Sequence, residues 1–237
     1  MSVRRIAINT GGGDAPGLNA VIRAVTLGAV DRGWEVLGIR DGYEGLFAEG
    51  GVVPLGRDDV RDIIHLGGTM LGTTNRGNPF ATGRDGAVID RLRELEVDVL
   101  VAVGGDGSLS IANRFAEAGV PVIGVPKTID HDLEETDDTT GFDSAVAFAT
   151  ECIDRLVATA SAHRRIMVVE VMGRTTGWIA LHAGVAAGAS VVLIPEIPYD
   201  LDVVADRIRD RASRGIEYTM VIVAEGASPI GGAPVTQ

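Results

Sequence analysis

Short apolar runs rich in Val and Ile alternate along the chain with longer segments in which apolar residues recur at helical spacing. The short runs predict strands at Arg4 to Ile8, Glu35 to Arg40, Val97 to Val103, Val120 to Val125, Ile166 to Val171, Val191 to Ile194 and Tyr218 to Ala224. The longer segments predict helices at Gly17 to Asp31, Gly86 to Leu95, Ser108 to Ala118, Gly141 to Ala160, Gly177 to Ala187 and Leu201 to Arg214. This alternation favours an α/β fold with a largely parallel sheet.

Length and composition agree with one large α/β domain or two closely coupled lobes. The chain has 237 residues, of which 46% are hydrophobic and only 4% aromatic, and its 32 glycines suit many tight strand-to-helix turns. An acidic turn at Thr136 to Gly141 leads into the longest predicted helix. We therefore predict a division into residues 1–137 and 138–237.

Charge and residue usage exclude several classes of function. The formal net charge is −12, whereas a nucleic-acid surface depends on clustered Lys and Arg, so we expect no nucleic-acid partner. No apolar run approaches the roughly 18 residues of a membrane span, and we expect a cytoplasmic protein without a membrane partner. Cys152 is the only cysteine, and the histidines His65, His131, His163 and His182 show no metal-ligand spacing.

The unusual residues cluster directly after predicted strands, where ligands bind in open α/β sheets. A glycine-rich loop at residues 11–17 leads into a helix, and its backbone N–H groups suit an anion such as phosphate. It matches neither the Walker A nor the dinucleotide pattern, so a turn of purely structural glycines remains an alternative. In Gly104 to Ser108, Asp106 is interpreted as a magnesium ligand or an ordinary turn residue, and Ser108 as a helix cap.

Two further groups of polar residues follow the next strands. Asp130 and Asp132 would face the same way in an extended loop, which suits one carboxylate as a general base and the other as a holder of the metal. A solvated acidic loop is the alternative. Arg164, Arg165 and Arg174 flank another strand, where guanidinium groups suit the recognition of phosphate and sugar groups or serve only to solubilise the surface.

The order and spacing of these motifs resemble the 6-phosphofructokinase family. The resemblance runs from Arg4 to Glu225 and is carried by GGDAPG-N, GGT-LG, GGDGS, P-TID-D, GFDSA and VVEVMGR-TG. It implies a Rossmann-like three-layer sandwich with mostly parallel sheets in two lobes, a donor lobe and a sugar-phosphate lobe. It also implies transfer of the γ-phosphoryl group of ATP to the 1-hydroxyl of fructose 6-phosphate in glycolysis, with Mg²⁺.

The resemblance also implies roles for individual residues. The donor would be bound by Gly13, Arg76, Gly77, Gly105, Asp106, Gly107 and Ser108, with Asp106 on the magnesium side. Asp130 would be the catalytic base, assisted by Thr128 and Arg76. The sugar phosphate would be bound by Thr128, Ile129, Asp130, Arg165, Met172, Gly173, Arg174 and Glu225. Because Arg165 resembles an arginine that reaches a neighbouring subunit, a homodimer or homotetramer with shared active sites is implied.

Departures from the family pattern leave alternatives open. Lys127 resembles the branch that uses pyrophosphate, whereas Gly107 resembles the ATP branch, so a pyrophosphate-dependent enzyme is the first alternative. A non-catalytic sugar-phosphate-binding regulatory subunit is the second. Arg76 stands one residue later than the commonest spacing, and His131 replaces a usual asparagine between the two aspartates. The chain also ends at Gln237, before the family's later sugar-phosphate residues, so we expect it to be truncated.

Overall fold

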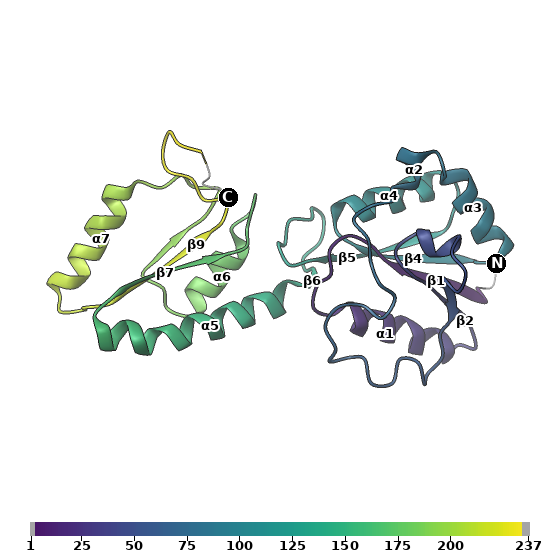
Figure 1. Ribbon diagram of the computed structural model, residues 1–237, viewed down its shortest axis with the longest axis horizontal. Coiled ribbons are helices and arrows are strands. Elements are labelled where there is room, and N and C mark those ends of the chain that lie inside the picture. The colour runs from purple at the N-terminus through teal and green to yellow at the C-terminus, as the bar shows by residue number, and fades with distance from the viewer. Residues whose placement is uncertain (1–2, 234–237) are drawn as a thin grey trace. The chain divides into compact units, whose positions relative to one another are not determined.

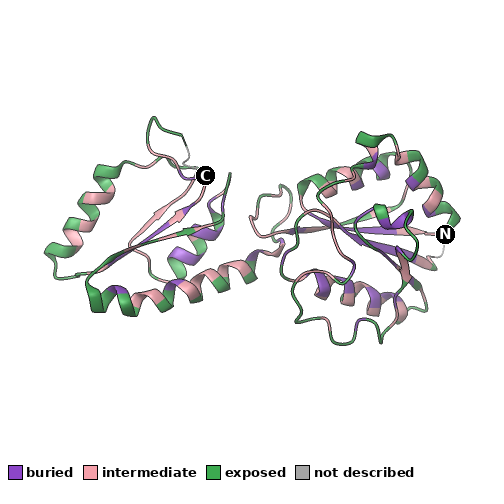
Figure 2. Ribbon diagram, in the orientation of Figure 1, coloured by how far each residue is buried: buried purple, intermediate pink, exposed green. Residues whose placement is uncertain are grey.

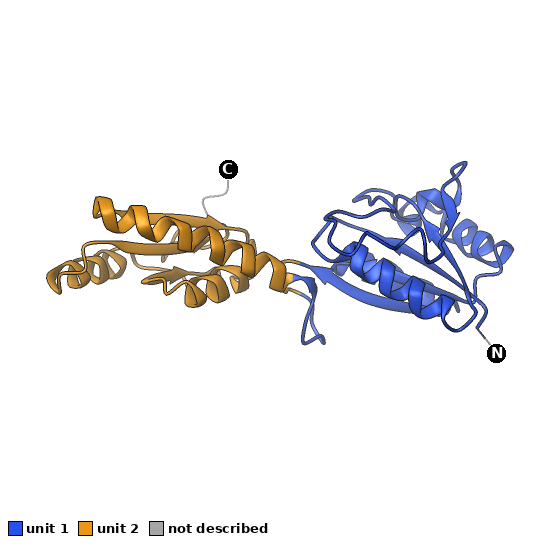
Figure 3. Ribbon diagram, turned by 90° about the horizontal axis from the view of Figure 1, so that it is seen from below, with its two compact units in different colours: residues 1–128, 133–141 blue, residues 129–132, 142–237 orange. Residues whose placement is uncertain are grey.

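The computed structural model describes residues 3–233, which form two compact units (Figure 3). Unit 1 holds the chain through Thr128 together with Leu133–Gly141, and unit 2 holds Ile129–Asp132 together with the chain from Phe142 onward. The predicted division after residue 137 falls inside the second stretch of unit 1. The donor and sugar roles of the two lobes stay predictions.

Unit 1 is built on a six-stranded sheet (Figure 1). Its strands lie in the order β3-β2-β1-β4-β5-β6 and are parallel except for β3. The strands are β1 (Arg5–Thr10), β2 (Glu35–Ile39), β3 (Val52–Pro54), β4 (Val99–Gly104), β5 (Val122–Thr128) and β6 (Thr140–Gly141). The helices are α1 (Leu18–Val30), η1 (Glu44–Leu46), α2 (Pro79–Thr82), α3 (Asp85–Glu94) and α4 (Asp106–Glu117).

The sheet of unit 1 is covered on both faces, because apolar residues of its central strands point to both sides. Ile6 and Ile8 pack with Leu18 of α1 in one core cluster. Ala7, between them, packs with Phe115 of α4 in the other cluster. Successive side chains of a strand point to opposite faces, so this alternation produces a helix–sheet–helix sandwich with a buried sheet (Figure 2).

Unit 2 contains a three-stranded parallel sheet in the order β7-β9-β8. Its elements are α5 (Phe142–His163), β7 (Ile166–Val171), α6 (Trp178–Ala186), β8 (Val191–Leu193), α7 (Leu201–Ser213) and β9 (Thr219–Ala224). Ile153 of α5, Ala180 of α6 and Ile222 of β9 belong to one buried cluster. The core of unit 2 therefore lies between the sheet and the pair α5 and α6.

The predicted fold class is confirmed, and every predicted strand and helix is present with ends shifted by a few residues. The sequence reading did not predict the strands β3 and β6 or the short helices η1 and α2. These elements are two to four residues long, which is too short for a periodic pattern. Among the described residues, no helix is both long enough and apolar enough to cross a membrane.

Candidate active site

The sheet of unit 1 reverses its strand order between β1 and β4. The chain continues from β1 to β2 and β3 on one side, and from β4 to β5 and β6 on the other. The loops that leave the carboxyl ends of such neighbouring strands diverge and open a crevice, where α/β proteins bind their ligands. At these two ends the sequence has its two glycine-rich motifs, residues 11–17 and 104–108.

The two glycine motifs interlock. The backbone N–H of Gly11 donates to the carbonyl of Val103, with an N–O distance of 2.9 Å. The Ser108 side chain fills the space between the motifs, because a Cβ on Gly11 would lie 2.7 Å from Ser108 Oγ. A Cβ on Gly104 would overlap Ser108 Cβ and approach the Gly11 carbonyl to 3.0 Å. We call Gly11–Gly13 and Gly104–Ser108 together the donor cradle.

This close packing predicts a large effect of one methyl group. We expect Gly104→Ala to lower the free energy of unfolding by about 1–3 kcal/mol, because the new Cβ overlaps Ser108 and approaches the Gly11 carbonyl, so that the two motifs must move apart. Gly107→Ala is the matched control, since nothing lies within 4 Å of a Cβ built there. Chemical denaturation of both variants measures the difference, and equal stability of the two would contradict the interlock.

The helix after β4 begins earlier than predicted. α4 starts at Asp106 with Gly105 as its N-cap, so the prediction that Ser108 caps the helix is wrong. The Ser108 N–H already donates to the Gly105 carbonyl at 3.0 Å within the first turn, and its hydroxyl lies against Gly11 and Gly104 instead. Asp106 therefore stands at the positive end of the helix dipole, beside N–H groups without intrahelical partners.

The side chain of Lys127 contacts the first glycine motif. Its side chain comes from β5, the residue is only 5% exposed, and its ammonium group donates a hydrogen bond to the Gly13 carbonyl. Its own carbonyl lies 3.3 Å from the position of a Cβ on Gly105. Lys127 thus touches both halves of the donor cradle, a contact that the sequence reading did not predict.

The predicted metal ligand, Asp106, suits the way in which Mg²⁺ binds together with phosphates and water. Asp106 is exposed at the mouth of the cradle, and no group of three or more His, Cys, Asp or Glu side chains gathers as a metal cage in residues 3–233. Mg²⁺ keeps several waters and binds through one or two carboxylates together with substrate phosphates. A single exposed carboxylate beside an anion cradle suits that mode.

The segment that carries Arg76 and Gly77 is held next to the first glycine motif. Gly12 donates its N–H to the Thr74 carbonyl at 3.1 Å, and Thr73 Oγ1 donates to the Gly12 carbonyl at 2.6 Å. The Arg76 N–H donates to Thr74 Oγ1 at 3.0 Å. The structure therefore brings the Arg76 segment to the donor cradle, with the Arg76 side chain exposed.

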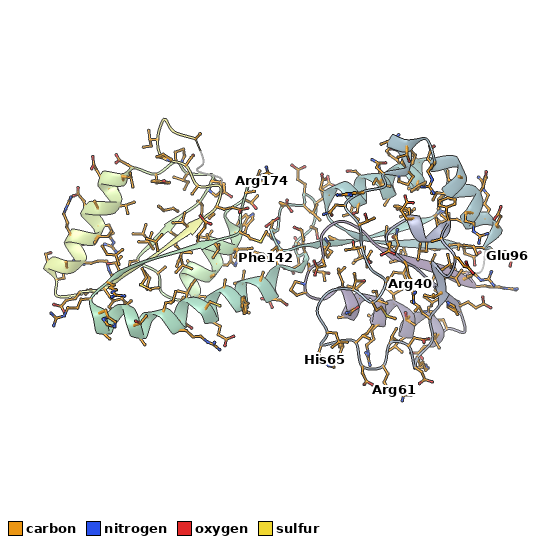
Figure 4. All side chains as sticks on the ribbon, in the orientation of Figure 1. Arg40, Arg61, His65, Glu96, Phe142 and Arg174 are labelled. Carbon is orange, nitrogen blue, oxygen red and sulfur yellow. The ribbon has the colours of Figure 1, made fainter. Side chains whose placement is uncertain are left out.

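A second group of predicted residues meets in unit 2. Met172–Arg174 follow β7, and Glu225 follows the neighbouring β9 (Figure 4 labels Arg174). The Glu225 N–H donates to the Val171 carbonyl and the Gly226 N–H to the Gly173 carbonyl, both at 3.0 Å. A Cβ on Gly226 would overlap the Arg174 carbonyl, so glycine permits this approach. We call Met172, Gly173, Arg174 and Glu225 the acceptor cluster.

The segment with the predicted base divides between the units. Thr128 ends β5 in unit 1, where its carbonyl accepts a hydrogen bond of 2.8 Å from Thr139 Oγ1. Ile129 and the half-buried Asp130 belong to unit 2, where the Asp130 carbonyl accepts a hydrogen bond of 2.9 Å from Thr176 Oγ1. The sequence reading gave Thr176 no role, although the R-TG motif contains it.

Arg165 is not brought together with the acceptor cluster within one chain. It precedes β7, whereas Met172–Arg174 follow it. Six strand residues span about 20 Å, so Arg165 lies at the opposite end of the strand.

The sheet topology and the cradle define the class: a doubly wound α/β protein with a glycine-lined cradle at its switch point, as in many enzymes that bind nucleotides and phosphates. The family model described as phosphofructokinase matches residues 5–236. The chain belongs to the phosphofructokinase family, which confirms the resemblance drawn from the motifs.

Three relatives illustrate the match. The chain is 49% identical to an ATP-dependent 6-phosphofructokinase of Chloroflexus aggregans, with 97% of this chain and 67% of the relative covered. It is 48% identical to a pyrophosphate–fructose 6-phosphate 1-phosphotransferase of Amycolatopsis methanolica, with 98% and 67% covered. A crystal structure of Pichia pastoris phosphofructokinase in the T-state matches with a TM-score of 0.91 and 34% identity, covering all of this chain and 27% of that one. The chain thus spans about two thirds of the curated relatives' length and a smaller share of that solved structure.

Proposed function

We propose that this protein is an ATP-dependent 6-phosphofructokinase of glycolysis. It transfers the γ-phosphoryl group of ATP to the 1-hydroxyl of fructose 6-phosphate. The observation that carries the proposal is the interlocked donor cradle at the switch point, in a family whose similar members include several named as ATP-dependent. A cytoplasmic location is part of the same proposal, because the proposed sugar-phosphate substrate is water-soluble.

The donor half of the mechanism rests on the cradle. The N–H groups of Gly11 and Gly12 already donate to the carbonyls of Val103 and Thr74, so the backbone N–H of Gly13 and those at the start of α4 hold the donor phosphates. Unpaired amides and the helix dipole attract anions. Asp106 would hold Mg²⁺, which neutralises charge on the phosphates when it is bound. Exposed Arg76 adds a positive charge from the segment hydrogen-bonded to Gly12.

The acceptor half rests on unit 2. The acceptor cluster orients the sugar, and Asp130 accepts the proton of the 1-hydroxyl as its oxygen forms a bond to the γ-phosphorus. The bond from that phosphorus to the leaving oxygen of ADP breaks in the same step. Thr128 steadies the transferring phosphoryl group, and Ile129 contacts the sugar.

A second copy of the chain would complete the sugar-phosphate site. The location of Arg165 at the far end of β7 supports this part of the proposal, because its own acceptor cluster lies about 20 Å away. The guanidinium group would bind the 6-phosphate of a sugar held by the partner. We therefore propose a homodimer or a homotetramer with shared sites.

Lys127 favours one second candidate, a pyrophosphate-dependent phosphofructokinase. Its ammonium group lies in the donor cradle, where it could replace contacts that a nucleotide supplies. Two similar relatives, 48% and 46% identical, carry the pyrophosphate name.

The experiment that tests the function uses the full chain with fructose 6-phosphate, Mg²⁺ and either ATP or pyrophosphate. We expect a sugar bisphosphate and ADP in equal amounts with ATP, measured by chromatography, and no ADP when the sugar is left out. Formation of no sugar bisphosphate with either donor would refute the proposal.

A further inference from the structure

The four residues Ile129–Asp132 leave unit 1 and pack as part of unit 2, although the chain returns to unit 1 directly afterwards. A segment this short cannot form a core of its own. Particular contacts must therefore hold it, and those contacts decide with which unit the base Asp130 is aligned.

One contact is the hydrogen bond that Thr176 Oγ1 donates to the Asp130 carbonyl at 2.9 Å. Thr176 stands two positions after Arg174, in the loop that carries the acceptor cluster. The backbone of Asp130 is therefore tied to the same loop that presents the cluster.

A second contact is made by the ring of His131. It stacks on Phe142, with ring centroids 4.5 Å apart and an angle of 24° between the planes. It also forms a T-shaped contact with Trp178 of α6, with ring centroids 5.8 Å apart and an angle of 88° between the planes. Figure 4 labels Phe142, at the start of α5. These are favourable aromatic geometries, and both partners belong to unit 2.

The backbone of His131 has an uncommon conformation. Its φ angle is 55°, in the left-handed region that only a few per cent of non-glycine residues adopt, histidine more often than most. Such a conformation persists only where the surroundings fix it. The Nδ1 atom of His131 is buried and has no hydrogen-bond partner among the described residues, so the ring is held by stacking rather than by that nitrogen.

We propose that His131 is a positioning residue that anchors the Asp130 segment to unit 2 through its ring, with Phe142 and Trp178 as the platform. The base is thereby preorganised toward the sugar hydroxyl as part of the acceptor side. This inference rests on the proposed function for its catalytic consequence, whereas the anchoring itself rests on the packing alone.

The test compares His131→Ala with His131→Phe in the full chain, in a Trp34→Phe background that leaves Trp178 as the only tryptophan in residues 1–237. We expect His131→Ala to lower kcat on the order of 10–100-fold, because a small displacement of a reacting group is costly. The Kd for ATP should stay unchanged, and the Trp178 emission should shift to longer wavelength. His131→Phe keeps an aromatic ring, so it should keep the wild-type emission and most of kcat.

The contrary outcomes are distinct. Full kcat in His131→Ala would remove the positioning role, and equal losses in the two variants would show that stacking is not what positions Asp130. Should His131→Ala fail to fold, Thr176→Val against Thr176→Ser tests the other half of the anchor, and equal kcat in that pair would overturn it. If wild-type protein phosphorylates no sugar, the proposed function fails, while the emission comparison still decides the anchoring.

Discussion

Asp130→Ser is expected to lower kcat by roughly 10²–10⁴-fold while the affinity for fructose 6-phosphate changes much less. The reason is that a general base acts on a proton that moves only in the transition state. The Asp130 carbonyl, which binds Thr176 Oγ1, is retained in the variant, so the backbone of the segment keeps this hydrogen bond. Steady-state kinetics with saturating ATP measure both quantities.

The matched control for this loss is Asp137→Ser. Asp137 is an exposed carboxylate seven residues further along the chain, and it has no proposed part in binding or catalysis. It should keep wild-type kcat, which separates loss of the base from a change in local charge. A wild-type kcat in Asp130→Ser would remove Asp130 from the mechanism.

The location of the donor cradle could be predicted from sequence, because it follows from chain order alone. Apolar runs give the strands, the strand ends give the loops, and both glycine motifs follow strands that turn out to be neighbours. The interlock through Ser108 could not be predicted, since Ser in such a motif favours a helix cap by local rules. Only the contact with Gly11, distant in sequence, gives Ser108 its actual surroundings.

The sequence also could not predict that the Asp130 segment belongs to unit 2. Local rules place this segment at the end of a strand of unit 1, and that is correct for Thr128. The Asp130 carbonyl bonds with Thr176, and the neighbouring ring of His131 packs on Phe142 and Trp178. All of these contacts depend on tertiary packing. The left-handed conformation of His131 could not be predicted from the sequence either, because only a minority of histidines adopt it.

We propose that the choice of donor depends on Gly107 and Lys127, with Gly107 the more important of the two. A Cβ on Gly107 would meet nothing within 4 Å, so a small side chain could be accommodated at this position and its absence leaves the backbone accessible. The ammonium of Lys127 already donates to the Gly13 carbonyl, and it therefore supports the cradle whichever donor binds. A buried cation tolerates ATP, whereas a carboxylate at position 107 would repel the α-phosphate.

We therefore expect ATP to be used, and pyrophosphate to be used poorly or not at all. Gly107→Asp should reduce kcat/KM for ATP sharply and allow some pyrophosphate activity to appear, because Lys127 is already in place. The fold should survive this change, since the site is open and an acidic residue in the first turn of α4 is favourable. Gly107→Asn, of nearly equal size but neutral, separates charge from bulk and should keep much more of the ATP activity. If the unmodified protein turned over faster with pyrophosphate than with ATP, Lys127 would be the better guide to the donor, and the argument from Gly107 would be wrong.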